Sequence, residues 1–150
     1  MNTAYKCSVV INFTNGDVRI EVLGDGQKFS FISGLGFIAL PELFLALSNL
    51  YKREANRSKV DYYGNYDYYY FSSDGTSLQV EHIAPYTDEI FYYIFNLKQY
   101  VIAVDKGFSE YLQLHRREGS LPLNQEDRLN PLGGNVIKYY NEFSLLINGH

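Results

Sequence analysis

The sequence predicts an α+β fold in which an antiparallel sheet of five to seven strands packs against two main helices. Three observations support this prediction: stretches of alternating apolar and polar residues, two stretches with apolar residues at helical spacing, and turn residues between them. A chain of 150 residues is most often one domain. We therefore expect residues 1–150 to form a single globular unit with one hydrophobic core.

The first third of the chain has the pattern of an antiparallel meander. Apolar residues alternate with polar ones over residues 5–13, and Asn15-Gly16 supplies a two-residue hairpin turn. The alternation resumes over residues 18–22, and a Gly-containing turn at 23–26 leads to a third strand that ends near Gly34. This pattern predicts a sheet with one apolar face and one face that is open to water.

The period changes after Pro41, which suits the first position of a helix. Apolar residues then recur at helical spacing, namely Leu43, Phe44, Leu47, Leu50 and Tyr51. We predict a helix over residues 41–56 that covers the apolar face of the meander.

Strand patterns return in the middle of the chain. Residues 60–71 alternate, with Tyr66, Tyr68 and Tyr70 on one face, and a turn at 73–75 leads to a returning strand over 76–83. The apolar run at 89–95 fits either a buried strand or the start of a helix, and we favour the strand.

The last third of the chain is predicted to be mainly helical. Apolar residues step by three and four over residues 97–117, which predicts the second main helix, and Gly119 is a plausible stop. Prolines and glycines make residues 120–134 a loop. The apolar tail at 136–147 fits a strand or a short helix.

Composition excludes several classes of protein. Cys7 is the only cysteine, so the chain has no internal disulfide and no cysteine-based zinc site, as expected in a reducing compartment. No secretory signal and no membrane span is recognisable, and we therefore expect a cytoplasmic protein without membrane partners. A net charge of −4 argues against nucleic-acid binding.

The sequence contains no recognisable catalytic motif. The three histidines lack metal-ligand spacing, and neither a nucleophile elbow nor a phosphate-binding loop is present. We therefore predict a non-enzymatic protein without cofactor or metal. A pocket that brings together two or more of four side chains would instead indicate an enzyme, and these are Glu81, His82, Asp105 and His115.

Charge and tyrosine are distributed unevenly. Residues 60–97 contain no Lys or Arg, but they hold six of the 17 acids and nine of the 15 tyrosines. Tyrosine gives rigid contact area at low entropic cost, and carboxylates steer cationic partners. This stretch is typical of a recognition surface for a basic partner.

The densest part of this stretch is residues 61–70. Only every second side chain of a strand can be buried in a two-layer fold, so several of these tyrosines should be exposed beside the acids. The predicted partner-binding residues are Asp61, Tyr62, Tyr63, Tyr66, Asp67, Tyr68, Tyr70 and Asp74.

In character the chain resembles the small cytoplasmic immunity proteins that neutralise bacterial toxins, including those of contact-dependent growth inhibition. The shared features are a compact acidic α+β domain, one cysteine, no catalytic motif and the acidic aromatic cluster at residues 61–74. The resemblance implies a stoichiometric inhibitor that forms a one-to-one heterodimer with a cognate protein toxin, often a basic nuclease. The acids would then mimic phosphates, and the tyrosines would be buried anchors.

Two other classes of binding protein fit the same residues. A carbohydrate-binding or small-ligand-binding domain would use tyrosines as stacking surfaces, but it would need a concave site. A phage-type inhibitor of a host enzyme would have the same sequence features as an immunity protein.

Overall fold

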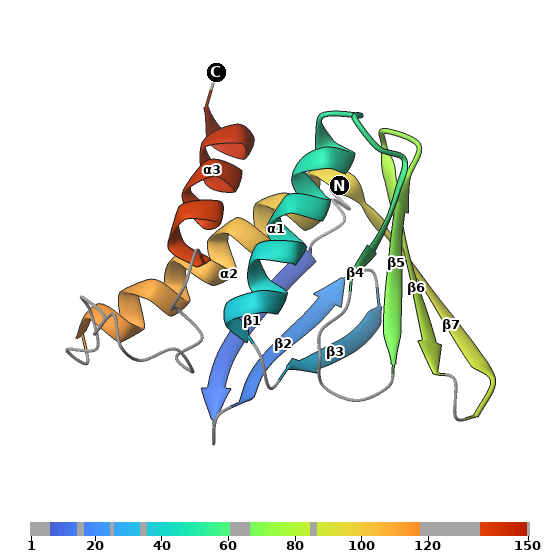
Figure 1. The fold of residues 1–150 in the computed structure, drawn as a ribbon, viewed down its shortest axis with the longest axis horizontal. Helices are drawn as coiled ribbons and strands as arrows, with labels where there is room; N and C mark the ends of the chain where they lie inside the picture. The colour runs from blue at the N-terminus through green and yellow to red at the C-terminus, as the bar shows by residue number, and fades with distance from the viewer. Residues whose placement is uncertain are drawn as a thin grey trace.

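The computed structural model describes residues 7–14, 17–24, 26–33, 36–60, 67–84, 87–117 and 136–149. Within these ranges the chain forms seven strands and three helices, which confirms the predicted α+β class (Figure 1). The seven strands form two antiparallel sheets, of three and four strands. No helix in these ranges has the length and apolar character needed to cross a membrane.

The first sheet is the predicted meander. Its strands are β1 (Cys7–Thr14), β2 (Asp17–Gly24) and β3 (Gln27–Ser33), in the order β1-β2-β3. Alternate side chains point into the core, so Val9, Ile20 and Phe31 are buried while Arg19 on the opposite face is exposed. The predicted apolar face and open face are therefore both present.

The second sheet consists of β4 (Arg57–Val60), β5 (Tyr68–Ser73), β6 (Ser77–Ala84) and β7 (Glu89–Asn96). The strands lie in chain order, and each is antiparallel to the next. The run at 89–95 is thus a strand, as favoured from the sequence. The separation into two sheets was not predicted: β3 and β4, which α1 connects in the chain, belong to different sheets.

Helix α1 (Gly36–Tyr51) begins before Pro41, so the prediction that Pro41 occupies the first helical position was wrong. Pro41 lies inside the helix and removes one main-chain donor. Ala39 and Leu40 are almost completely buried, and their burial stabilises the extra N-terminal turn.

Helix α1 also ends earlier than predicted, because the chain adopts a left-handed conformation at Arg53, with φ of 62°. The N–H of Glu54 donates to the Asn49 carbonyl at 2.9 Å, and the N–H of Arg53 donates to the Leu50 carbonyl at 3.2 Å. These two bonds form a Schellman motif, in which glycine usually occupies the position of Arg53.

Helix α2 (Leu97–Arg117) has the predicted bounds. The Asn96 side chain accepts a hydrogen bond from the N–H of Gln99 at 2.9 Å and so caps the first turn. It is α2 that lies directly against β1, whereas α1, predicted to cover the meander, lies alongside β4, β5 and helix α3.

Helix α3 (Val136–Asn148) resolves the alternative left open for the C-terminal tail. Asp105 of α2 accepts hydrogen bonds from Tyr140 and Asn148, both at 2.8 Å. The Phe143 ring is fully buried against Phe44 of α1, with ring centroids 5.4 Å apart. Helix α3 is therefore attached to both other helices.

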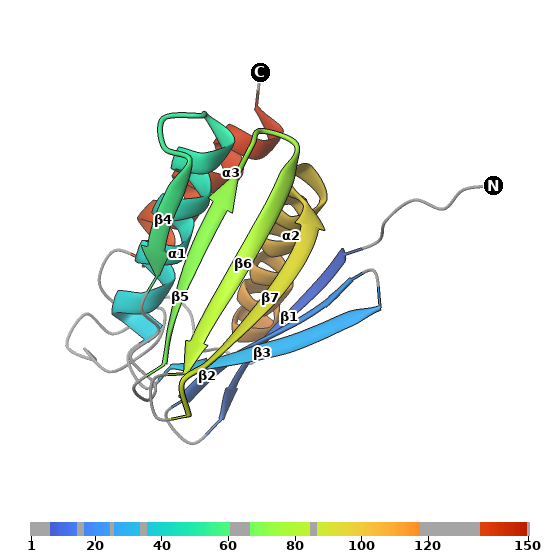
Figure 2. The same cartoon turned by 90° about the vertical axis from the view of Figure 1, so that its right-hand side faces the viewer.

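The two sheets meet through aromatic side chains of β3. Phe29 stacks on Tyr93 of β7 at 4.4 Å between centroids, and Phe31 meets Tyr69 of β5 edge-on at 4.6 Å. Figure 2 shows β3 crossing close to the second sheet, with the helices behind that sheet. The described buried residues of both sheets and all three helices form one contiguous core.

Gly107 allows the close contact between α2 and β1, and a side chain there should destabilise the fold. A Cβ atom at this position would overlap the main-chain carbonyl oxygen of Val9. We predict that Gly107→Ala lowers the free energy of unfolding by about 1–3 kcal/mol, despite the better helix propensity of alanine. Chemical denaturation measures this change. The exposed neighbour substitution Lys106→Ala should stay within about 0.5 kcal/mol of wild type, and equal stabilities of all three proteins would contradict the packing described.

Candidate functional site

None of the three helices in the described residues covers the outer face of the second sheet. Tyr69, Phe71, Val80 and Phe95 are buried, so the side chains that alternate with them point away from the core. In Figure 2 this sheet faces the viewer and the three helices lie behind it. We call this surface the outer face, and its residues are Arg57, Lys59, Tyr68, Tyr70, Ser72, Gln79, Glu81, Ile83, Ile90, Tyr92 and Ile94.

Strand register arranges the outer face in three rows. The first row contains Tyr68, Ile83 and Ile90, and the second contains Lys59, Tyr70, Glu81 and Tyr92. The third contains Arg57, Ser72, Gln79 and Ile94. Apolar and aromatic side chains thus run across the sheet, and charged side chains are concentrated in the second and third rows.

Strand β7 contributes the most exposed apolar area of this face. Tyr92 is 57% exposed, Ile94 56% and Ile90 48%. Large apolar side chains that cluster on an uncovered surface are typical of interaction sites. Sequence reasoning missed these three residues, because an apolar run without charged residues was interpreted as a buried strand. The only sequence feature that could have indicated their exposure was their position in the strand, where they alternate with Tyr93 and Phe95.

Two cations from β4 lie over the tyrosines of β5. The Arg57 guanidinium is 4.1 Å from the centre of the Tyr70 ring, and the Lys59 ammonium is 4.5 Å from that of Tyr68. Arg57 also forms an ion pair with Glu81 at 3.7 Å. Such contacts hold long side chains in place over the rings. The outer face therefore carries both signs of charge, although residues 60–97 contain no cation.

Asp67 lies on the inner side of the sheet with His82. Its Oδ2 is 2.7 Å from His82 Nε2, and the Tyr69 ring stacks on the imidazole at 4.5 Å. Burial, together with the negative charge of Asp67, raises the pKa of Tyr69 far above its ordinary value. Asp67 alternates with Tyr68 along the strand, so the two side chains do not share a face.

Asp74 organises the turn between β5 and β6. Its Oδ1 accepts hydrogen bonds from the N–H groups of Thr76 at 2.9 Å and Ser77 at 2.8 Å. Gly75 follows with φ of 99°, a conformation that glycine adopts without strain. The carboxylate lies at the end of the sheet and is held by the main chain. Asp74 is therefore positioned for turn formation and does not belong to the outer face.

The eight predicted site residues thus fall into three groups. Tyr68 and Tyr70 lie on the outer face, whereas Asp67 and Asp74 lie elsewhere on the sheet. The other four, Asp61, Tyr62, Tyr63 and Tyr66, lie outside the described residues.

The residues considered for an enzyme are dispersed where the structure describes them. Glu81 is on the outer face, His82 is on the inner side of the sheet, and Asp105 binds Tyr140 between helices. The side chain of His115 lies outside the described residues. Within the described part of the chain, no three His, Cys, Asp or Glu side chains come close enough together to hold a metal ion.

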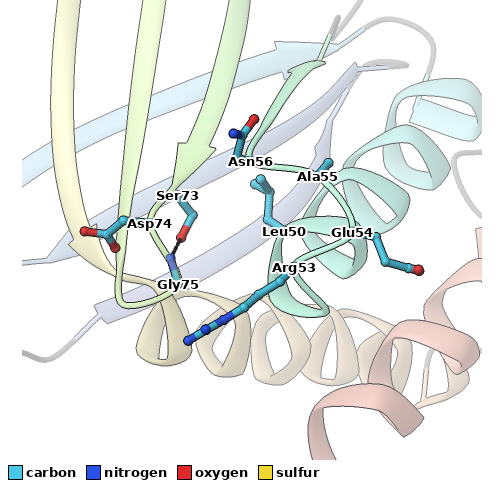
Figure 3. A pocket seen from close by; sticks show the side chains of 8 residues that line it. All are labelled: Leu50, Arg53, Glu54, Ala55, Asn56, Ser73, Asp74 and Gly75. Atoms are coloured by element: carbon cyan, nitrogen blue, oxygen red, sulfur yellow. Dashed lines mark hydrogen bonds between the residues drawn. The ribbon is translucent and has the colours of Figure 1, made fainter.

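A shallow cleft of about 510 Å³ lies where α1 ends beside the turn of Asp74 (Figure 3). Figure 3 shows the Arg53 side chain extending from the end of α1 towards Gly75. A second cleft of about 480 Å³ shares Asn56, Ser73 and Asp74 with the first. Neither cleft has a tyrosine among its described lining residues. The described residues therefore do not place a tyrosine-stacking surface in either cleft.

Comparisons of this chain with protein-family models, with curated proteins and with solved structures find no match.

The main-chain bonds to Asp74 predict a dependence of stability on pH. They lower the pKa of this carboxyl below its ordinary value, so its stabilising effect is present above pH of about 4 and is lost as the pH falls through the lowered folded-state value. Asparagine can accept the same bonds but does not titrate. We predict that Asp74→Asn loses less stability on acidification than wild type, as measured by denaturation across the acid range. A constant difference between the two proteins at every pH would contradict this role.

Proposed function

We propose that this protein is a stoichiometric inhibitor that binds a partner protein through the outer face of β4–β7. The observation that supports this proposal most directly is the set of exposed Ile90, Tyr92 and Ile94 side chains on β7, which lie on the same sheet face as Tyr68 and Tyr70, with β6 between them. Among the described residues, no helix covers this face. Protein interfaces place aromatic side chains at a dry centre and charged groups at the rim. This face carries aromatic side chains on β5 and β7 together with charged groups on β4 and β6.

The geometry of the face favours binding at low entropic cost. Its tyrosines project from paired strands, and Tyr68 and Tyr70 are additionally in contact with each other at 5.9 Å between ring centroids. Cations already lie against these two rings. Because the groups are ordered before the partner arrives, less conformational freedom is lost on association. The surface is thus suited to a rigid partner of complementary shape.

The resemblance to immunity proteins implies that the partner is a toxin domain and that binding neutralises the toxin. A basic partner, such as a nuclease, would meet Glu81 on the outer face and the exposed Asp88 and Glu89 at its border. Arg57 and Lys59 would require acidic or carbonyl groups on the same partner. The mixed charges would fix the orientation of the complex, while the aromatic and aliphatic side chains would supply most of the affinity.

Co-expression with the protein encoded next to this chain tests the proposed function. The neighbour is expected to be toxic alone, and this chain should restore growth and copurify with it as a one-to-one complex. A harmless neighbour that forms no complex would contradict the proposal.

Within such a complex, Tyr92→Ala should weaken binding by about 2 kcal/mol or more, because it removes an aromatic anchor that is 57% exposed on the outer face. Calorimetric titration measures the affinity. Ile32→Ala is a matched control, because Ile32 is 44% exposed but lies on the outer side of the other sheet. Full affinity in Tyr70→Ala, Tyr92→Ala and Ile94→Ala would rule out the outer face as the binding surface.

A basic partner predicts that added salt slows association, since salt screens the attraction between Asp88, Glu89 and cationic groups. Stopped-flow measurements at several salt concentrations give this rate. Replacing both acids by the corresponding amides should remove most of the salt dependence. An association rate that does not respond to salt in wild type would exclude steering by these acids.

A further inference from the structure

Strand β7 exposes apolar side chains and also forms one edge of its sheet. It is the last strand in the order β4-β5-β6-β7, so among the described strands only β6 pairs with it. Ile90, Phe91 and Tyr92 are consecutive, and their side chains are 48%, 40% and 57% exposed. An apolar edge strand can pair with strands of other chains and so cause aggregation, and native proteins protect such edges.

The side chain of Gln27 takes the place of a neighbouring strand at Ile94. Gln27 Nε2 donates to the Ile94 carbonyl at 2.6 Å, and the Ile94 N–H donates to Gln27 Oε1 at 2.9 Å. Two residues of a hydrogen-bonded antiparallel pair exchange the same two bonds through their main chains. The amide of Gln27 therefore satisfies, from the first sheet, the donor and the acceptor that Ile94 would otherwise offer at the edge.

The packing of β3 holds Gln27 at this edge. Gln27 is the first residue of β3 and follows Gly26, whose φ of 76° belongs to the turn from β2. Phe29 lies two residues further on the same face of β3, where it is buried and stacks on Tyr93, the neighbour of Ile94. The contact of Gln27 with Ile94 is therefore a continuation of the packing between the two sheets.

The Gln27 contact leaves only a short stretch of this edge open. Main-chain groups that point outward alternate along a strand, so those of Ile90 and Tyr92 point the same way as those of Ile94. Within the described part of the chain, no group bonds the outward groups of these two residues. Asp88, directly before β7, has a left-handed backbone with φ of 55°, which interrupts the extended conformation. The open edge therefore lies between Asp88 and the Gln27 contact.

We propose that Gln27 protects the edge of β7, because its side chain closes the edge at Ile94 and so keeps the exposed strand from pairing with strands of other chains. With Gln27 in place, an added strand can bond only along residues 90–92, and this length is at the lower limit for a strand. Without Gln27, Ile94 becomes a further bonding residue and the open segment extends over residues 90–94, which is an ordinary strand length.

This role of Gln27 goes beyond the proposed function and does not depend on it. Gln27 bonds main-chain groups at the edge of the sheet, whereas the side chains of Tyr92 and Ile94 remain exposed on the outer face. Strand β7 can therefore offer apolar side chains to a partner while its main chain stays protected.

Hydrogen exchange of main-chain amides tests the contact in the wild-type protein. The N–H of Ile94 should exchange more slowly than that of Tyr92, by about fivefold or more after correction for sequence effects, because Gln27 accepts a hydrogen bond from Ile94 alone. In Gln27→Ala the two amides should exchange at similar rates, while the amide of Tyr93, which faces β6, should remain slow. Equal exchange at Ile94 and Tyr92 in wild type would overturn the proposal.

Sedimentation over a range of concentrations tests the protective role. Wild type should remain monomeric, whereas Gln27→Ala should self-associate increasingly with concentration, because the longer segment of the edge is then open. Lys28→Ala is the matched control and should remain monomeric, because the exposed Lys28 lies on the opposite face of β3, in register with Leu23. Gln27→Ala that stays as monomeric as wild type, or wild type that associates as strongly as Gln27→Ala, would overturn the proposal.

A second substitution in Gln27→Ala shows whether the association uses the edge of β7. Tyr92→Pro removes an outward N–H, and proline is tolerated on an edge strand where this group faces solvent. The double variant should return to the monomeric state. Ile90→Lys in the same background serves if the proline variant does not fold, because lysine on an edge strand disfavours pairing. Association that persists in a folded double variant would show that β7 is not the pairing edge and would overturn the proposal.

Discussion

The contact between β3 and the inner face of the second sheet determines which residues of this protein can reach a partner. Phe31 packs edge-on against Tyr69, which is buried, and Phe29 stacks on Tyr93, which is partly buried against the core. Side chains alternate between the two faces of a strand, and a shift of one residue would exchange the faces. Because Tyr69 and Tyr93 face inward, the alternating side chains of Tyr68, Tyr70, Tyr92 and Ile94 face outward. The outer face follows from the packing of two phenylalanines.

Much of the fold could be predicted from the sequence, because local patterns determine local structure. The alternation and the turn residues predicted the meander and the β5–β6 hairpin, and apolar spacing predicted α2 with its bounds. The start of α1 could not be predicted in this way. Its extra turn depends on burial of Ala39 and Leu40 against distant residues, which outweighs the preference of Pro41 for the first helical position. The separation into two sheets likewise depends on tertiary contacts.

The candidate site was only partly predictable, because it combines residues from several strands. The sequence of one strand does not indicate which strands lie beside it. Tyr68 and Tyr70 were recognised from alternation. Lys59 and Arg57 lie outside the acidic tyrosine-rich stretch in sequence but come to lie over those rings in space. Asp74 was predicted to bind a partner because it is an acid close to the tyrosine-rich segment. In the structure its carboxylate instead accepts hydrogen bonds from main-chain N–H groups of a turn. The charge of a sequence segment therefore does not give the charge of the surface on which it lies. The surface charge also depends on which residues the neighbouring strands place beside that segment.

The most direct test of the central claim is hydroxyl-radical footprinting of the tyrosines, with and without the copurified product of the neighbouring gene. In the free protein Tyr92 should react readily, while the buried Tyr69 and Tyr100 should react little. Binding through the outer face predicts strong protection of Tyr92 and weaker protection of Tyr68 and Tyr70, with Tyr139 of α3 unchanged. Protection of Tyr139, or a complex in which Tyr92 reacts as in the free protein, would contradict the claim.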